Sequence, residues 1–141
     1  MADSIFTKII KHEIPAHIIY EDELVIAFLD IKPVNKGHAL VVPKKPFENI
    51  FDGDDESLAH MIKTAKKLSN IIKETVGADG VNLIMNNGEH AGQEVFHAHL
   101  HIIPRHKGDG SFTTKHCDCY EDSEASALAT QLSSIISEKE A

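Results

Sequence analysis

Apolar residues recur along the chain with two different periods, and these periods predict its secondary structure. Helical spacing predicts three helices, over residues 5–10, 54–76 and 123–137. Short apolar or alternating runs bounded by turn residues predict five strands, over residues 17–20, 24–29, 38–42, 81–86 and 94–103. Pro15 is expected to end the first helix and Gly77 the second. This order of elements is typical of an α+β domain with an antiparallel sheet.

The last of these strands has the strictest alternation. One of its faces is apolar throughout, with Phe96, Ala98, Leu100 and Ile102. The other face carries His97, His99 and His101, and Pro104 is expected to end the run. Successive side chains of a strand point to opposite faces. We therefore expect one face to join the core while the other presents a row of three imidazole rings.

Three interpretations of this histidine row are possible. The chain has 10 histidines, so the row could be structural filler, but partly buried polar rings are costly unless each is hydrogen-bonded. The row could bind a metal ion. On a regular strand, however, the backbones of His97 and His101 lie about 13 Å apart, and zinc holds its nitrogen ligands at about 2.0–2.1 Å. Only a neighbouring pair, completed by His38 or a carboxylate, could share one ion.

The third interpretation, catalysis by the imidazoles themselves, fits the pattern best. A neutral histidine is a nucleophile toward phosphorus, and its ordinary pKa of about 6.5 lies near neutrality. Neighbouring imidazoles disfavour being charged together, so one ring can stay neutral for attack while another carries a proton. The protonated ring can stabilise phosphoryl oxygens and protonate a leaving group.

Composition and charge narrow the class of protein. The length of 141 residues, with 42% hydrophobic and 26% charged residues, suits a single domain over residues 1–141. The net charge of -8 argues against nucleic acid or an anionic membrane surface as partner. The chain has no apolar run long enough to span a bilayer, and its start lacks the features of a signal peptide. With two cysteines, these features predict a cytoplasmic protein.

The segment 97–103, His-Ala-His-Leu-His-Ile-Ile, resembles the defining motif of the histidine-triad (HIT) superfamily, in which three histidines alternate with apolar residues. Residues 5–16 resemble the opening of its Hint branch, and residues 28–33, 37–44 and 91–93 resemble further blocks of the family. The resemblance therefore covers a core of about residues 5–105 and leaves about 106–141 as a C-terminal extension. It implies a HIT-like fold, namely a five-stranded antiparallel sheet with two main helices plus a C-terminal helix.

The same resemblance implies an activity. Hint-like enzymes hydrolyse purine nucleoside phosphoramidates and related conjugates at the α-phosphate, through a nucleotidyl-histidine intermediate. By position, His99 is the nucleophile, held by a backbone carbonyl at Nδ1. His97 would position it, supported by His38, and His101 would contact the phosphate and assist the leaving group. No metal or other cofactor is implied, and a homodimer joining two five-stranded sheets is expected.

The resemblance also implies substrate-binding residues. Asp30 corresponds to the acid that accepts hydrogen bonds from the ribose hydroxyls, and Ile31 follows it. Phosphate contacts are expected from Asn86, Gly92, Gln93 and Glu94. The slot for a purine base would be formed by Phe6, Ile9, Ile14, Phe28 and Leu29, although their spacing alone suggests core positions. Basic residues could attract an anionic substrate, namely Lys44, Lys45, Arg105 and Lys107.

Several positions depart from the pattern or leave alternatives open. Glu94 stands where many Hint proteins carry serine, and a carboxylate pointing inward would repel phosphate. The N-terminal cysteines that bind zinc in some bacterial relatives are missing around Thr7, so no zinc site is expected there. His116, Cys117 and Cys119 form an incomplete zinc set and are expected to be inert. A dinucleoside polyphosphate hydrolase and a nucleotide-binding interaction protein remain the alternative functions.

Overall fold

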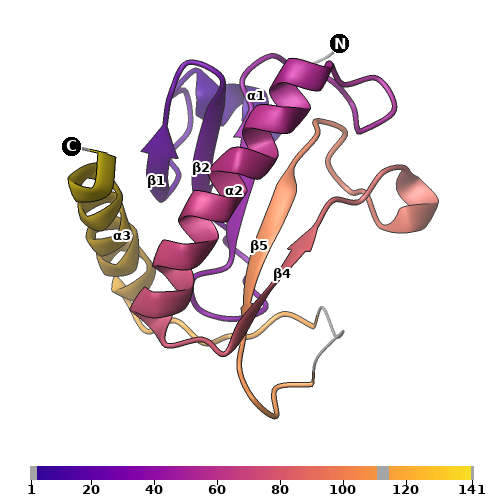
Figure 1. Cartoon of the computed structure of the whole chain (residues 1–141). Helices are drawn as coiled ribbons and strands as arrows, with labels where there is room; N and C mark the ends of the chain where they lie inside the picture. The colour runs from indigo at the N-terminus through magenta and orange to yellow at the C-terminus, as the bar shows by residue number, and fades with distance from the viewer. Residues whose placement is uncertain (1–2, 111–114, 141) are drawn as a thin grey trace.

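The computed structural model describes residues 3–110 and 115–140. Its elements follow the predicted order (Figure 1). The helices are α1 (Ile5–Ile10), α2 (Asp55–Val76) and α3 (Glu124–Glu140), with a short 3-10 turn over Glu89–Ala91. The strands are β1 (Ile18–Glu21), β2 (Val25–Leu29), β3 (Ala39–Pro43), β4 (Gly80–Ile84) and β5 (Leu100–Arg105). The α+β prediction is confirmed.

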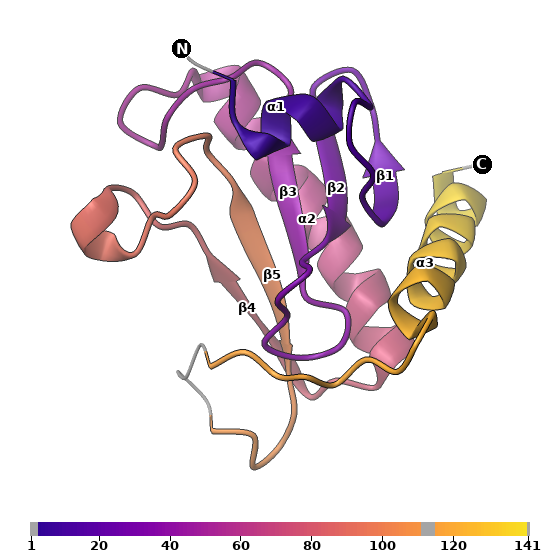
Figure 2. The same cartoon turned by 180° about the vertical axis from the view of Figure 1, so that it is seen from behind.

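The five strands form one antiparallel sheet in the order β1-β2-β3-β5-β4. Helix α2 crosses one face of this sheet, and α3 lies beside it along β1 (Figure 1). Figure 2 shows the molecule from the opposite side, where α1 lies over the ends of β2 and β3. No helix among the described residues is both long and apolar enough to cross a membrane.

The helix ends follow local rules of capping. Ser4 caps α1 and Asp54 caps α2, each by accepting a hydrogen bond from a backbone N–H of the first turn. Gly77 ends α2 in the left-handed conformation, with φ of 68°, as expected for a glycine at this position. Helix α1, however, ends well before Pro15, because Lys11 is its C-cap and His12 turns the chain with φ of 59°.

The sheet has an apolar cluster on each face. The larger cluster packs the sheet against α2 and α3, and Leu29, Val41, Leu68 and Ile102 are among its buried residues. The smaller cluster lies under α1 and contains Phe6, Ile9, Ile26, Phe28, Leu40 and Val42. Alternate residues of β2 and β3 thus serve opposite faces, and the histidine row shares the face of the smaller cluster.

The histidine segment is only partly a strand, which corrects the prediction. β5 begins at Leu100, and its last pair with β3 is Val41 with Leu100. Beyond that pair, Ala98 donates its N–H to the carbonyl of Phe47 in a loop, and the Pro43 carbonyl is occupied by the side chain of His97. Pro43 has no N–H to offer a ladder. At the other end β5 includes Pro104, which was expected to end it.

Candidate active site

The triad histidines share one face even though His97 and His99 precede the strand. The residues between and after them, Ala98, Leu100 and Ile102, are buried in the cluster that faces α2. On the opposite face the rings form a row, with centroids 5.1 Å apart for His99 and His101. The period of two therefore persists through irregular backbone, and it was this period that the sequence revealed.

His99 has the geometry of a nucleophile. Its Nδ1 lies 2.8 Å from the backbone oxygen of His97. A carbonyl oxygen only accepts, so Nδ1 carries the proton of the neutral ring and Nε2 keeps its lone pair. Burial lowers the pKa of His99, while the hydrogen bond to His97 and the charges of Asp30 and Glu94 oppose this shift. The ring is therefore neutral at neutral pH and 7% of the residue remains exposed.

His101 is set by a second chain of hydrogen bonds that begins at another backbone group. The N–H of Val34 donates to Nδ1 of His38 across 2.9 Å, so His38 carries its own proton on Nε2. His38 Nε2 lies 2.9 Å from Nδ1 of His101 and donates this proton to it, which leaves His101 with its own proton on Nε2. His101 therefore offers a donor where His99 offers a lone pair.

The buried pair His38 and His101 is neutral in the ligand-free protein. Burial lowers the pKa of His38 to about 4, and the nearby His116 contributes in the same direction. Burial also lowers the pKa of His101 to about 4, with further contributions from His99 and His38. The 3.4 Å separation of His38 Nε2 from Asp30 Oδ2 is therefore a polar contact and not an ion pair at neutral pH.

His38 was expected to support His97, and the structure places it against His101 instead. His97 is fully buried, and its two nitrogens meet other partners. Nε2 lies 2.8 Å from the carbonyl oxygen of Pro43, and Nδ1 lies 3.3 Å from the hydroxyl oxygen of Ser4. The contact with Ser4 could not be predicted from the sequence, because the two residues are 93 positions apart.

Asp30, His38 and His101 each bring a possible ligand atom within 4.8 Å of the others. This cluster differs from the set that the sequence left open for a metal, because it contains only one histidine of the row, together with His38 and Asp30. The hydrogen bond from Val34 does not fit it, since His38 then has its proton on Nε2, the nitrogen that faces the other two groups. Binding a cation there would require His38 to shift that proton and lose the backbone bond. The donor set favours a proton-carrying relay.

Asp30 lies directly after β2, beside the imidazole row. Its Oδ1 accepts the backbone N–H of Lys32 at 2.8 Å, which fixes the turn that follows. Its backbone N–H donates to the oxygen of His38. The carboxylate keeps part of its surface exposed. It is thus held near the triad, and its predicted contact with ribose stays a prediction.

The residues predicted to hold the base fall on both faces of the sheet. Phe6, Ile9 and Phe28 are buried together, and Ile14 packs against them. The ring of Phe6 stands edge-on to that of His99, with centroids 5.0 Å apart. Leu29 is on the opposite face, in the cluster under α2, so its prediction as a slot residue is wrong. Ile31, just beyond, is 77% exposed.

Two residues of the predicted phosphate loop have their polar groups engaged within the chain. The buried side chain of Gln93 donates to the carbonyls of Glu48 and Val95 and accepts from the N–H of Gly88 and the amide of Asn49. The N–H of Gly92 closes the turn at Glu89. Gln93 and Gly92 therefore shape the loop, and their expected contacts with phosphate stay a prediction.

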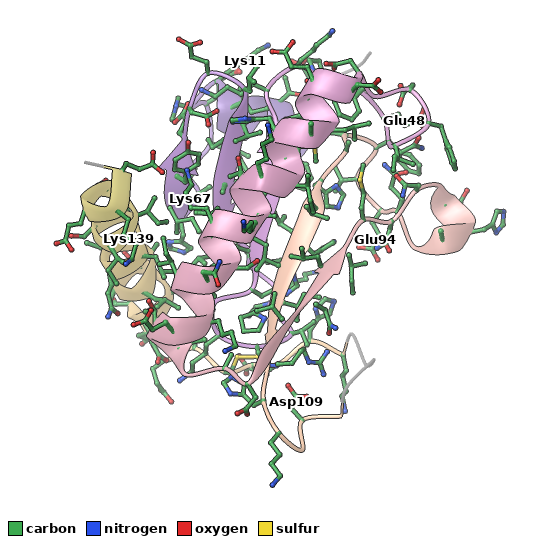
Figure 3. All side chains as sticks on the ribbon, in the orientation of Figure 1. Lys11, Glu48, Lys67, Glu94, Asp109 and Lys139 are labelled. Carbon is green, nitrogen blue, oxygen red and sulfur yellow. A yellow bond between two sulfur atoms is a disulfide. The ribbon has the colours of Figure 1, made fainter. Side chains whose placement is uncertain are left out.

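The other two residues expected to contact phosphate are Asn86, which is half-buried, and Glu94, which is exposed. Asn86 places its side-chain nitrogen 3.4 Å from the carbonyl oxygen of Gly92. Glu94 is exposed and carries its carboxylate on the loop that leads into the triad (Figure 3). Its charge is close enough to favour the protonated form of His99. Neither contact tests the predicted binding of phosphate.

Three of the basic residues expected to attract substrate are paired with acids. Arg105 is buried, and its guanidinium bonds to Asp109, which Figure 3 marks in the turn after β5. Lys44 pairs with Glu21 at 2.7 Å, and Lys45 lies 3.7 Å from Asp54. Their expected attraction for an anionic substrate stays a prediction. Cys117 and Cys119, expected to be inert, are joined by a disulfide in this structure.

Comparison with known proteins agrees with this architecture. The HIT domain model matches residues 11–108. An uncharacterised HIT-like protein of Methanocaldococcus jannaschii is 57% identical over 106 residues, covering 75% of this chain and 81% of that protein. Adenylylsulfatase HINT3 of Arabidopsis thaliana is 39% identical over 107 residues, which are 76% of this chain and 54% of HINT3.

A solved structure gives the same result. A hypothetical histidine triad nucleotide-binding protein from Sulfolobus tokodaii has a TM-score of 0.84 at 40% identity, covering 95% of this chain and 92% of the other. The sheet and its row of imidazoles thus define a histidine-triad domain. The chain belongs to the HIT family, whose members are typically nucleotide hydrolases or transferases.

Proposed function

We propose that this protein hydrolyses purine nucleoside 5′-phosphoramidates at the α-phosphate through a nucleotidyl-histidine intermediate. Substrates of this class include AMP-NH2, AMP joined to a lysine-like amine, and aminoacyl-adenylates. The observation that carries the proposal is the hydrogen bond from His99 Nδ1 to the His97 carbonyl, which leaves Nε2 as a lone pair beside a neighbouring N–H donor.

In the first half of the reaction, His99 Nε2 attacks phosphorus and forms a P–N bond. The bond from phosphorus to the leaving amine breaks, and its electron pair stays on the amine nitrogen. That nitrogen takes a proton from His101. The free ring of His101 has its pKa lowered to about 4, and its Nδ1 accepts the Nε2 proton of His38. For His101 to carry the second proton, the bound phosphate must raise that pKa and the His38 ring must turn its Nε2 proton away from His101.

In the second half, a water molecule attacks the same phosphorus. The water gives a proton to His101, and the P–N bond to His99 breaks with its electron pair returning to Nε2. AMP leaves, and both rings regain their starting states. The two imidazoles supply the nucleophile and the general acid and base, so the proposed cycle needs no metal ion.

The substrate is held by residues around this row. Asp30 accepts hydrogen bonds from the ribose hydroxyls, and the base lies against the apolar residues Phe6, Ile9, Ile14 and Phe28. Ile31 and Asn86 border the nucleoside and the phosphate, and the exposed Glu94 lies toward the leaving group. A carboxylate at that position favours leaving groups with an amine over those with further phosphates, because like charges repel.

Two other functions are compatible with the same face. A dinucleoside polyphosphate hydrolase uses the same chemistry on a different leaving group, and a relative named as an adenylylsulfatase suggests a sulfate leaving group. Parallel assays with AMP-NH2, adenylyl sulfate and diadenosine tri- and tetraphosphate separate these cases. A nucleotide-binding interaction protein is the alternative outside enzymes, and it predicts that His99→Ala leaves the cellular role intact.

We further propose that the protein works in the cytoplasm as a homodimer. β4 is the end strand of the described sheet, and its Leu83 is 41% exposed. Phe51 and Phe96 are also exposed, by 81% and 42%. Exposed apolar side chains beside a free strand edge favour pairing with a second copy. Light scattering with Leu83→Lys, compared with the unchanged protein, tests this. A monomer in both samples would contradict it.

The chemistry is tested by trapping the intermediate. Protein mixed with an adenylate phosphoramidate is quenched in denaturant at neutral or alkaline pH, since the P–N bond to histidine is acid-labile, and its peptides are analysed by mass spectrometry. We expect an adenylyl group on the peptide with His99, and none in His99→Ala. An adduct on another residue, or turnover without an adduct in single-turnover samples, would overturn the mechanism.

A further inference from the structure

Helix α1 reaches the triad through the Ser4 hydroxyl. Its oxygen lies 3.3 Å from His97 Nδ1, while the other ring nitrogen, Nε2, lies 2.8 Å from the Pro43 carbonyl oxygen. A carbonyl only accepts, so Nε2 carries the proton. Burial lowers the pKa of His97, which keeps the ring neutral. Its Nδ1 is then an acceptor, and Ser4 must be the donor.

The reciprocal cap of α1 leaves the hydroxyl proton of Ser4 available for this bond. Thr7 donates its N–H to the Ser4 hydroxyl oxygen at 3.1 Å, and Ser4 donates its own N–H to the Thr7 hydroxyl oxygen at 3.2 Å. The two hydroxyl oxygens are 3.3 Å apart, so Thr7 can donate to Ser4. Ser4 thus accepts at the helix end and donates to His97, and each group has a partner.

We propose that Ser4 is a positioning residue for the nucleophile, an inference that rests on the proposed function of His99. Both ring nitrogens of His97 are held, so the ring cannot rotate, and this restricts the backbone at residue 97. The carbonyl of that residue is the group that receives the Nδ1 proton of His99. Through His97, the Ser4 hydroxyl therefore fixes the direction in which His99 presents Nε2.

The first test compares two variants that disturb α1 to a similar extent. Ser4→Ala removes the donor to His97, and Thr7→Val removes the other half of the cap but leaves that donor in place. With an adenylate phosphoramidate, we expect kcat to fall about tenfold in Ser4→Ala, as for the loss of one hydrogen bond. It should change less than about twofold in Thr7→Val, since no bond to His97 is lost. KM should change by a similar factor in both variants, because both alter the helix that carries Phe6.

Two further variants separate donation from capping. Ser4→Thr keeps the hydroxyl and should restore kcat. Ser4→Asp keeps a strong cap but has no proton to donate at neutral pH, so its kcat should fall as in Ser4→Ala while the protein stays folded. Equal kcat values in Ser4→Ala, Ser4→Asp and Thr7→Val would overturn the proposal.

The second test needs no substrate, so it is independent of the proposed function. Nitrogen-15 NMR of the ligand-free protein should find His97 with its proton on Nε2, and the Nδ1 resonance should shift in Ser4→Ala but not in Thr7→Val. An unchanged Nδ1 resonance in Ser4→Ala would overturn the proposal. If the resonance shifts but the unchanged protein fails to turn over any adenylate, the proposed function fails and the hydrogen bond stands.

Discussion

His99 and His101 are neighbours in one row, and the backbone prepares them in opposite ways. His99 is held by a carbonyl oxygen, an acceptor, which draws its proton to Nδ1 and leaves a lone pair at Nε2. His101 is held through His38 by the N–H of Val34, a donor, which leaves a proton at Nε2. A backbone acceptor acts on one histidine and a backbone donor on the other, and this difference gives two residues of the same type complementary roles.

Removing the lone pair should have the largest effect. In His99→Ala, turnover should fall by a factor on the order of 10³–10⁶, as for the loss of other catalytic nucleophiles, and nucleotide binding should persist. Steady-state kinetics and equilibrium binding of AMP provide the measurement. His12→Asn is a matched control, because it removes an exposed imidazole at a positive φ that asparagine tolerates. Activity above about one-tenth of the starting value in His99→Ala would contradict the assignment.

Removing the donor should have the next largest effect. His101→Ala should lower kcat by about 10²–10⁴-fold, the usual contribution of a general acid. The loss should be smaller for substrates whose leaving group is already a good one, since these need no proton. A series of aryl phosphoramidates and aryl esters of AMP measures this dependence. An identical loss for poor and good leaving groups would show that His101 does not act as the acid.

The link between the backbone and His101 can be broken at His38. His38→Phe removes the imidazole that accepts from the N–H of Val34 and donates to His101. It therefore leaves the buried N–H of Val34 without its partner. We expect destabilisation of about 1–3 kcal/mol and a loss of kcat smaller than in His101→Ala. Chemical denaturation and kinetics measure both. Stability equal to that of the unchanged protein would contradict the hydrogen bond.

As the pH falls, protonation of His38 and His101 in the unfolded state should destabilise the protein before most carboxylates become protonated. The folded pKa values of His38 and His101 are about 4, below the ordinary value of 6.5 that the unfolded chain restores. Between these two pKa values the unfolded state binds more protons than the folded state. The contribution of this pair to the free energy of unfolding is therefore fully present above pH 6.5 and is lost as the pH drops toward 4. Thermal unfolding at several pH values measures the effect. His38→Phe should reduce the slope, and an unchanged slope would count against a neutral pair.

The sequence could predict the row of imidazoles because the period of two depends only on which face each residue takes. It survived where the strand did not, at His97 and His99. It could not assign a face to Leu29, since the run 24–29 is apolar at every position; the resemblance predicted a slot residue there, whereas the spacing alone suggested the core position that Leu29 occupies. Phe28 lies on the histidine face and Leu29 on the other, and because both are apolar the sequence does not show which of them faces the histidines.

Long-range hydrogen bonds were the part that could not be predicted. The resemblance predicts that Gln93 contacts phosphate, but in the structure its side-chain amide forms hydrogen bonds with Glu48 and Asn49, which are distant in the sequence. The contact of Ser4 with His97 depends on how α1 packs on the sheet, and the bond from Val34 to His38 depends on the path of a loop. Such partners become visible only when the fold brings them together.

The most direct test of the contrast between the two rings is nitrogen-15 NMR of the histidine side chains at neutral pH without ligand. We expect His99 to be neutral with its proton on Nδ1 and His101 to be neutral with its proton on Nε2. A proton on Nε2 of His99 would remove the lone pair from the site of attack and contradict the assignment of His99 as the nucleophile.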